Sequence, residues 1–267
     1  MIDILAYGFG QRALLAGVLV ALTCSTLGVF LVLKRQSLIS DGLGHVSLAG
    51  IAAGVLFGFY PIYGAIAAVF AGVFGINALR KLRIPGDAAI AILFSAGLAL
   101  GVVLISASKY ASADLLSYLF GAILGIGYTD VYLALGLGFA VMATIYVLFK
   151  ELFAVTFDPE FARVSGLPVE RLELVFTLLT GITVVISIKL VGILLVTSLI
   201  VIPAVSAMLL RLDFKNTLLA ANAIAVLSVV IGLMASFYYD LASGGTIVLV
   251  SVGIFAAVLA NSRIWQR

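Results

Sequence analysis

The chain consists of long apolar runs separated by short polar breaks, a pattern that predicts a bundle of membrane-spanning helices. The runs approach or reach the roughly twenty residues that a helix needs to cross the hydrocarbon core, and they lack the alternation of barrel strands. We predict an all-α polytopic membrane protein with nine spans, or with eight if one segment lies at the interface. The predicted spans cover about 12–33, from within 41–45 to about 59, 62–79, 88–107, 131–149, 172–188, 190–210, 216–237 and 245–262.

Two shorter elements are expected between the spans. The apolar piece at 115–126 is too short to cross a membrane and predicts a re-entrant or interfacial helix. In segment 158–166, Asp158 suits a helix N-cap, Pro159 a first turn and Gly166 a C-terminal stop. This segment predicts a short helix outside the membrane. It is either a solvated connector, as most loops of this length are, or a docking helix for a cytosolic partner.

Small residues and a proline predict how two of the spans are shaped. Gly50, Gly54 and Gly58 lie four residues apart in the second span, a stripe that lets another helix approach closely. Pro203 lies inside the seventh span, where it frees a backbone carbonyl and is expected to kink the helix. Thr197 and Ser198 could bond the freed groups.

Composition agrees with the membrane assignment and excludes other classes. Hydrophobic residues make up 64% of the 267 residues and charged residues 10%, against roughly 25% charged in a soluble domain. The basic residues sit at the ends of apolar runs rather than in a patch, so nucleic acid is not an expected partner. No GxxxxGK[ST] phosphate loop and no stretch long enough for a nucleotide-binding fold is present. We therefore expect one transmembrane domain over 1–267 that is not itself an enzyme.

The basic residues also predict the orientation. With the N-terminus outside and the C-terminus in the cytosol, 12 of the 15 basic residues fall on the inner side. The 12 are Lys34, Arg35, Arg80, Lys81, Arg83, Lys150, Arg163, Arg171, Arg211, Lys215, Arg263 and Arg267. Only Arg12, Lys109 and Lys189 fall outside. This split follows the positive-inside rule and favours nine spans over eight.

The candidate chemistry lies at the start of the second span. Asp41 precedes His45, the only histidine, by four residues, so a helix would project both side chains from one face. A carboxylate and an imidazole at membrane depth are expensive, suggest an ion pathway, and form a plausible ligand pair for a divalent transition metal. The alternative that the residues leave open is a helix cap at Asp41 and a histidine that packs against a neighbouring helix.

Two ligands are too few for a bound metal, so others must come from elsewhere in the chain, from water or from a second subunit. The further candidates are Asp240, Asp114 and the hydroxyls of Ser37, Ser40 and Ser47. Asp240 follows the eighth span, where spacing alone favours a solvated loop residue.

Five segments together resemble the permease subunits of zinc/manganese ABC importers, the ABC-3 family, over nearly the whole chain. They comprise Asp41, His45, Leu48 and Gly50; Asp114 with Tyr118–Gly121; Asp158, Glu160, Ala162 and Gly166; Gly192–Ala204; and Asp240 with Gly244. Ala242 stands where that family has a proline in its last motif, which weakens any role for Asp240.

The resemblance implies a homodimer with a pore between two copies in the cytoplasmic membrane of a prokaryote. Two ATPase subunits would dock on the helix around Asp158–Gly166, and an extracytoplasmic binding protein would deliver the metal. Asp41 and His45 would line the pore and contact the passing ion. No permanently bound cofactor is expected. Zinc, manganese and iron(II) all accept an Asp/His pair, so the residues do not select one.

Three other functions compete with this interpretation. An ABC permease for a metal chelate or cobalamin would not need the Asp/His pair, and such permeases usually have an extra N-terminal span that this sequence does not show. An ion-coupled secondary carrier would favour an inverted repeat with broken helices, and no convincing repeat is found. A membrane scaffold has no reason to keep polar groups at membrane depth.

Overall fold

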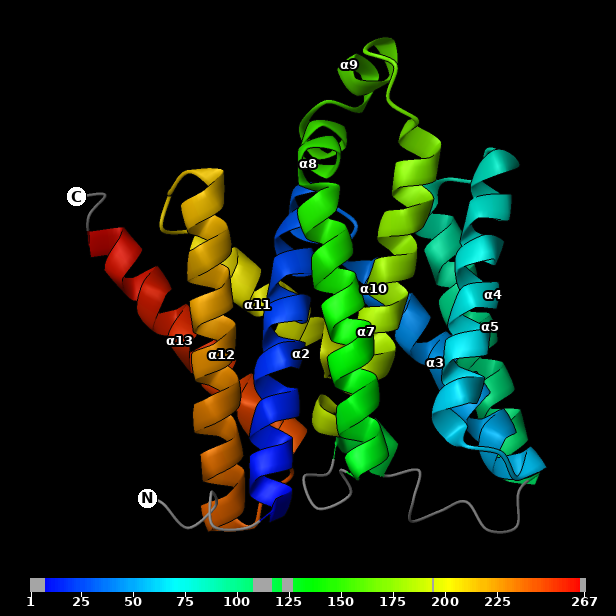
Figure 1. Ribbon diagram of the computed structural model, residues 1–267, viewed down its shortest axis with the longest axis vertical. Coiled ribbons are helices and arrows are strands. Elements are labelled where there is room, and N and C mark those ends of the chain that lie inside the picture. Colours follow the sequence, from blue (N-terminus) through cyan, green and yellow to red (C-terminus); the bar gives the residue numbers. More distant parts are fainter. Residues whose placement is uncertain (1–7, 108–116, 122–126, 194, 265–267) are drawn as a thin grey trace. The chain divides into compact units, whose positions relative to one another are not determined.

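A computed structural model of the chain describes residues 8–107, 117–121, 127–193 and 195–264 (Figure 1). The described residues form helices and contain no strand, which confirms the all-α polytopic prediction. Eight helices are long and apolar enough to span a membrane. They are α2 (Gly8–Leu33), α3 (Leu38–Phe57), α4 (Pro61–Lys81), α5 (Gly86–Ala107), α7 (Tyr128–Val147), α10 (Val169–Val191), α12 (Phe214–Tyr239) and α13 (Ser243–Ile264). Asp114 and most of the predicted interfacial helix at 115–126 lie outside the described residues.

The predicted seventh span is the one whose extent is wrong. The sixth and seventh predicted spans meet near Lys189, but α10 continues to Val191 and ends where Gly192 adopts a left-handed φ of +88°. The chain resumes as α11 (Val196–Met208), which has 13 residues and continues through Pro203. At 1.5 Å per residue this is about 20 Å, shorter than a hydrocarbon core of about 30 Å. The span count therefore becomes eight full-length helices and one shorter apolar helix among the described residues.

The chain forms two compact units. Unit 1 comprises Met1–Ser37, Ser117–Ala140 and Ile186–Arg267, and unit 2 comprises Leu38–Leu116 and Val141–Val185, as far as each is described. Helices α7 and α10 therefore belong in part to each unit.

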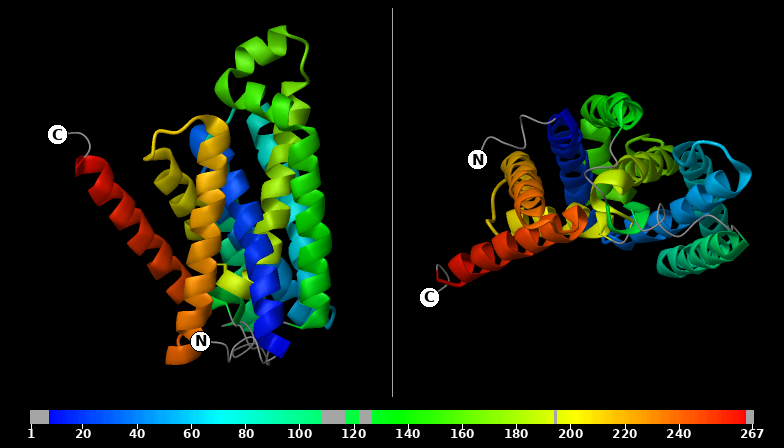
Figure 2. Two further views of the ribbon diagram at one scale, coloured as in Figure 1. Left: turned by 60° about the vertical axis from the view of Figure 1, so that its left-hand side comes forward. Right: turned by 90° about the horizontal axis from the view of Figure 1, so that it is seen from below.

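Unit 1 is built on contacts among α2, α11, α12 and α13. Small residues allow these helices to approach closely: a Cβ atom at Gly28 of α2 would overlap the carbonyl oxygen of Ile200 of α11. One core cluster joins Val29 of α2 to Ala204 and Ala207 of α11 and to Ala221 of α12. Helix α13 begins against α12 and diverges from it towards its C-terminal end (Figure 2). Close approach of the helix backbones at small residues therefore helps to hold this unit together.

Polar side chains on α2 bond to neighbouring helices inside the apolar interior of unit 1. The hydroxyls of Ser25 and Thr26 both donate to Oδ1 of Asn222 on α12, the latter at 3.1 Å. The sulfur of Cys24, a buried free cysteine, lies 3.2 Å from the hydroxyl of Ser187 on α10. Hydrogen bonds of this kind tie membrane helices together where few other polar partners are available.

The end of α10 and the start of α13 meet the segment that ends at Gly121. We call this contact the glycine junction and define it as Gly121, Gly192 and Gly244. Gly121 and Gly192 have φ values of +76° and +88°, which favour glycine. The backbone N–H of Ile193 donates to the Tyr118 carbonyl at 2.9 Å. A Cβ atom at Gly244 would overlap the Val191 carbonyl oxygen. Non-helical backbone at membrane depth is tolerated where protein buries it, and these contacts supply that burial.

Unit 2 is organised around α3, which packs against both α4 and α5. A Cβ atom at Gly50 of α3 would overlap the Gly64 carbonyl oxygen of α4, and the reverse also holds. Gly54 packs against Pro61 at the start of α4. The predicted small-residue stripe is thus confirmed for Gly50 and Gly54. Gly58 differs, because its φ of +74° ends α3 and nothing lies within contact distance of a Cβ atom there.

Candidate metal pathway

The first turns of α3 carry the Asp41–His45 pair. Helix α3 begins at Leu38, three residues earlier than the predicted start of the span, so Asp41 lies in its first turn. The four-residue spacing on a continuous helix places both side chains on one face, as predicted, and they interact electrostatically. Asp41 is half-buried and His45 is 8% exposed. A charged carboxylate at the positive end of a helix is favourable, so the local fold tolerates Asp41 at this depth.

Helix α5 fixes the position of His45. The Phe94 ring lies edge-on to the imidazole, with ring centroids 4.3 Å apart and an angle of 63° between planes. Gly97 lies one turn further along α5. The site has no room for a side chain, because a Cβ atom there would lie 2.7 Å from the Val46 nitrogen. The α5 backbone therefore rests directly on the α3 backbone at His45, and the imidazole has little freedom to turn away.

His45 carries an unsatisfied nitrogen. Its Nδ1 is buried and has no hydrogen-bond partner among the described residues. A buried polar atom without a partner normally costs about 1–3 kcal/mol, so its presence in a folded structure needs an explanation. One explanation is that the nitrogen lone pair is available to bind a passing cation. The neighbouring Asp41 carboxylate, which would also attract a cation, agrees with this explanation. The packing-histidine alternative would instead be expected to satisfy this atom.

No described group of three or more His, Cys, Asp or Glu residues surrounds the pair. The Ser47 hydroxyl donates to the Gly44 carbonyl at 2.5 Å, and both Ser37 and Ser40 have partners of their own. Asp240 belongs to unit 1, where it ends α12 with a left-handed φ of +51° and an exposed side chain. Within the part of the chain that the structure describes, the candidate site thus consists of one carboxylate and one imidazole.

The predicted short helix outside the spans is present as α9 (Pro159–Val164). The Asp158 carboxylate accepts a hydrogen bond from the Phe161 N–H at 2.9 Å, so Asp158 caps the helix as predicted. At the other end, Gly166 has a φ of +85°. The N–H of Leu167 donates to the Ala162 carbonyl at 3.0 Å and that of Gly166 to the Arg163 carbonyl at 3.1 Å. This is the Schellman arrangement, which favours glycine at the turn position.

Helix α9 is anchored by one small residue and leaves an apolar surface uncovered. Ala162 is fully buried in a cluster with Val155, Val169 and Leu172. Phe161 and Val164 are 67% and 88% exposed, and Glu160 is exposed beside them. The preceding residues form α8 (Phe149–Phe157), a helix that the sequence analysis missed. Apolar residues at 148, 152 and 155 follow a helical period and could have revealed it.

Phe94 and Gly97 were also missed as partners of the candidate site. A signal existed, because Gly97 and Gly101 of the fourth predicted span repeat the four-residue spacing seen in the second. Gly101 packs against the Leu48 side chain of α3, at 3.2 Å from a Cβ atom placed there. Two matching stripes in neighbouring spans predict that these spans pack together, although not which side chain then faces His45.

Several long apolar helices, a polar pair on a buried helix and a capped helix outside the spans together describe a multi-pass membrane protein. The sequence matches the ABC 3 transport family over residues 6–262, and the chain belongs to this family. It is therefore a multi-pass membrane permease subunit of an ABC transporter.

Individual relatives cover almost the whole chain. A manganese transport system membrane protein, MntC, of Halalkalibacterium halodurans is 35% identical over 95% of this chain and 87% of its own length. A probable iron transport system membrane protein of Haemophilus influenzae is 32% identical over 100% and 98%. Among solved structures, PsaBC from Streptococcus pneumoniae in complex with Fab has a TM-score of 0.87 and 30% identity, over 96% of this chain and 93% of the other.

Proposed function

We propose that this chain forms the membrane pathway of an ABC importer for a divalent transition metal, with manganese as the principal ion and zinc and iron(II) as competitors. The proposal is carried by the buried Nδ1 of His45, which has no hydrogen-bond partner among the described residues and interacts electrostatically with Asp41, in a chain of the ABC 3 family. The name of the Halalkalibacterium relative favours manganese, and that of the Haemophilus relative keeps iron in consideration.

A sparse site suits transport better than storage. The Asp41 carboxylate would lower the cost of placing a dication in a low-dielectric pathway. The neutral His45 nitrogen would favour a transition metal over Ca²⁺ or Mg²⁺, which prefer oxygen ligands. Because conduction requires that a bound ion also leave, two protein ligands with water or a second copy completing the shell meet the requirement better than a closed cage. Asp240 and Asp114 are weaker candidates for the same pathway.

The assembly that we infer consists of two copies of this chain acting as single permease domains, two ATPase subunits and an extracytoplasmic binding protein, in a lipid bilayer. We place the N-terminus outside and the C-terminus in the cytosol of a prokaryotic inner membrane. Within unit 1, Lys34 follows α2 and Arg211 precedes α12; within unit 2, Arg80 and Lys81 end α4. Basic residues at these helix ends occur where the positive-inside rule expects cytosolic loops for this orientation.

The test of the proposed function is metal uptake into proteoliposomes that contain the chain with its ATPase and binding protein. Manganese, zinc and iron(II) are compared in parallel, each with and without ATP. We expect ATP-dependent uptake, greatest for manganese. An assembled complex with an active ATPase that takes up none of the three ions would contradict the proposal and favour a larger ligand, such as a metal chelate.

Helix α9 is the proposed contact with the ATPase, through Asp158, Glu160, Ala162 and Gly166. Asp158, Ala162 and Gly166 would shape and anchor the helix, whereas Glu160 and the exposed Phe161 would touch the partner. We expect Phe161→Ala to lower transport-coupled ATP hydrolysis by about tenfold, as loss of a buried aromatic anchor does at other interfaces. The measurement is ATPase activity of the reconstituted complex, with copurification of the two subunits alongside.

The matched control for this variant is Phe57→Ala, which removes another exposed phenylalanine, at the end of α3. It should leave coupling unchanged. Full coupled activity in Phe161→Ala together with Glu160→Ala would exclude α9 as the docking helix.

A further inference from the structure

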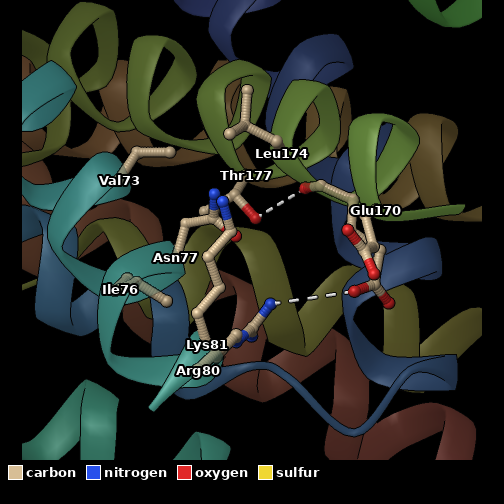
Figure 3. Close-up of a pocket in the computed structure, with 9 residues that line it drawn as sticks. Val73, Ile76, Asn77, Arg80, Lys81, Glu170, Leu174 and Thr177 are labelled. Carbon is tan, nitrogen blue, oxygen red and sulfur yellow. Dashed lines mark hydrogen bonds and ion pairs between the residues drawn. The ribbon is translucent and has the colours of Figure 1, made fainter.

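A cavity of about 180 Å³ lies inside unit 2 between the end of α4 and the start of α10 (Figure 3). Val73, Ile76 and Leu174 form its apolar part, and Asn77 and Thr177 lie between this part and the charged rim. It is therefore large enough for a small polar head group.

The rim of the cavity carries charges of both signs from two different helices. Arg80 and Lys81 lie in the last turn of α4, and Glu170 lies in the first turn of α10 with Glu173 one turn on. Each charge is favoured locally by the dipole of its own helix. Interaction with the helix dipoles explains why basic and acidic residues occur at these helix ends. It does not explain why they surround a cavity.

The direct pairing across the cavity is loose. Arg80 Nη1 lies 4.0 Å from Glu173 Oε2, whereas a charge-assisted hydrogen bond is about 2.8 Å long. The guanidinium therefore keeps N–H donors for a ligand. Two cations and two carboxylates sum to zero, so a simple anion or a simple dication would meet like charges on one side. A molecule with a phosphate and an ammonium group a few bonds apart would meet opposite charges on both sides.

The setting indicates where such a molecule comes from. Both helices are long enough to span the membrane, so their ends lie at the level of the lipid head groups. Basic side chains in pockets between membrane helices at this depth are recognised contacts for the phosphates of lipid head groups, and Arg80 and Lys81 supply such side chains here. The apolar wall formed by Val73, Ile76 and Leu174 suits the glycerol and first methylenes of a lipid, and would be poorly used by a soluble phosphate ester.

We propose that this cavity binds the phosphoethanolamine head group of a phospholipid. The phosphate lies against Arg80 and Lys81, the ammonium against Glu170 and Glu173, and the glycerol against the apolar wall. A bound lipid would bridge α4 and α10 in place of the loose Arg80–Glu173 pair. This inference depends only on the membrane location of the two helices, so failure of the metal-import proposal would leave it standing.

The test is native mass spectrometry of the complex of this chain and its ATPase, released from nanodiscs that hold equal amounts of phosphatidylethanolamine, phosphatidylcholine and phosphatidylglycerol. We expect phosphatidylethanolamine to be retained about tenfold over the other two. The quaternary ammonium of phosphatidylcholine has no N–H to donate, and phosphatidylglycerol has no cation for the carboxylates. Loss of one charge-assisted partner corresponds to about tenfold in affinity.

Two variants act on opposite ends of the head group. Arg80→Gln and Glu170→Gln should each lower retention about tenfold, whereas Lys215→Gln, which removes an exposed lysine outside the cavity, should not change it. Equal retention of all three lipids by the wild-type complex would identify annular lipid only and overturn the proposal, without any need for a variant to fold. Displacement of the bound lipid by micromolar soluble phosphoethanolamine would show that the site takes the free head-group compound. It would overturn the proposal that the ligand is a membrane lipid.

Discussion

Replacing His45 by alanine is expected to reduce ATP-dependent metal uptake by about a hundredfold or more while the transporter still assembles. Loss of an outer-shell partner of a metal ligand alone costs about 10–100-fold, and loss of the ligand itself costs at least as much. Asp41→Asn, which keeps the shape of the side chain and removes its charge, should have a similar effect. Uptake is measured in proteoliposomes, and assembly by copurification with the ATPase and by gel filtration.

Two variants make the comparison specific. Asp87 is also an acidic residue in the first turn of a unit 2 helix, but it is exposed at the start of α5, so Asp87→Asn should transport normally. Ser47→Ala removes a buried hydroxyl half a turn from His45 that donates to the Gly44 carbonyl of its own helix, and this variant should also transport normally. If Asp41→Asn and His45→Ala both transport like the wild type, the pair serves in helix packing alone.

The second large effect is expected at Gly244 in the glycine junction. Gly244→Ala places a methyl group into the carbonyl oxygens of Val191 and Phe120, which are backbone atoms that cannot rotate away. We expect it to destabilise the protein by about 3 kcal/mol or more, at or beyond the usual range for overpacking. The measurement is thermal unfolding of the purified chain in detergent, followed by circular dichroism or by aggregation.

The neighbouring glycine provides the matched control. Gly245 has no heavy atom within 4 Å of a Cβ position, so Gly245→Ala should leave stability unchanged or raise it slightly through helix propensity. The two changes are chemically identical and one residue apart. Similar unfolding temperatures for both would show that the contact at Gly244 does not contribute to stability.

The elements that follow from a strong local pattern could be predicted from the sequence. Spans with long apolar runs came within a few residues of α2, α4, α5 and α12. The capped helix α9 could be predicted because Asp158, Pro159 and Gly166 each have a local conformational preference that needs no distant partner.

What could not be predicted depends on contacts between residues far apart in the chain. Gly58 fits the same spacing as Gly50 and Gly54, and only the fold shows that it ends α3 instead of packing. The end of α10 at Val191, just before Gly192, depends on backbone contacts with Gly121 and Gly244. Asp41 and His45 could be proposed from their spacing, whereas the Phe94 ring that confines His45 comes from another helix.

The brevity of α11 has a consequence for how the protein is made. A segment of 13 residues is too short to be held in the bilayer as an independent span, and the non-helical backbone at Gly192 and Ile193 cannot be exposed to lipid. During synthesis, α11 therefore cannot insert stably into the bilayer through its own hydrophobicity alone. Its contacts with α2, made early, and with α12 and α13, made only after these have left the ribosome, complete its insertion. Membrane integration of this segment is thus a late folding event.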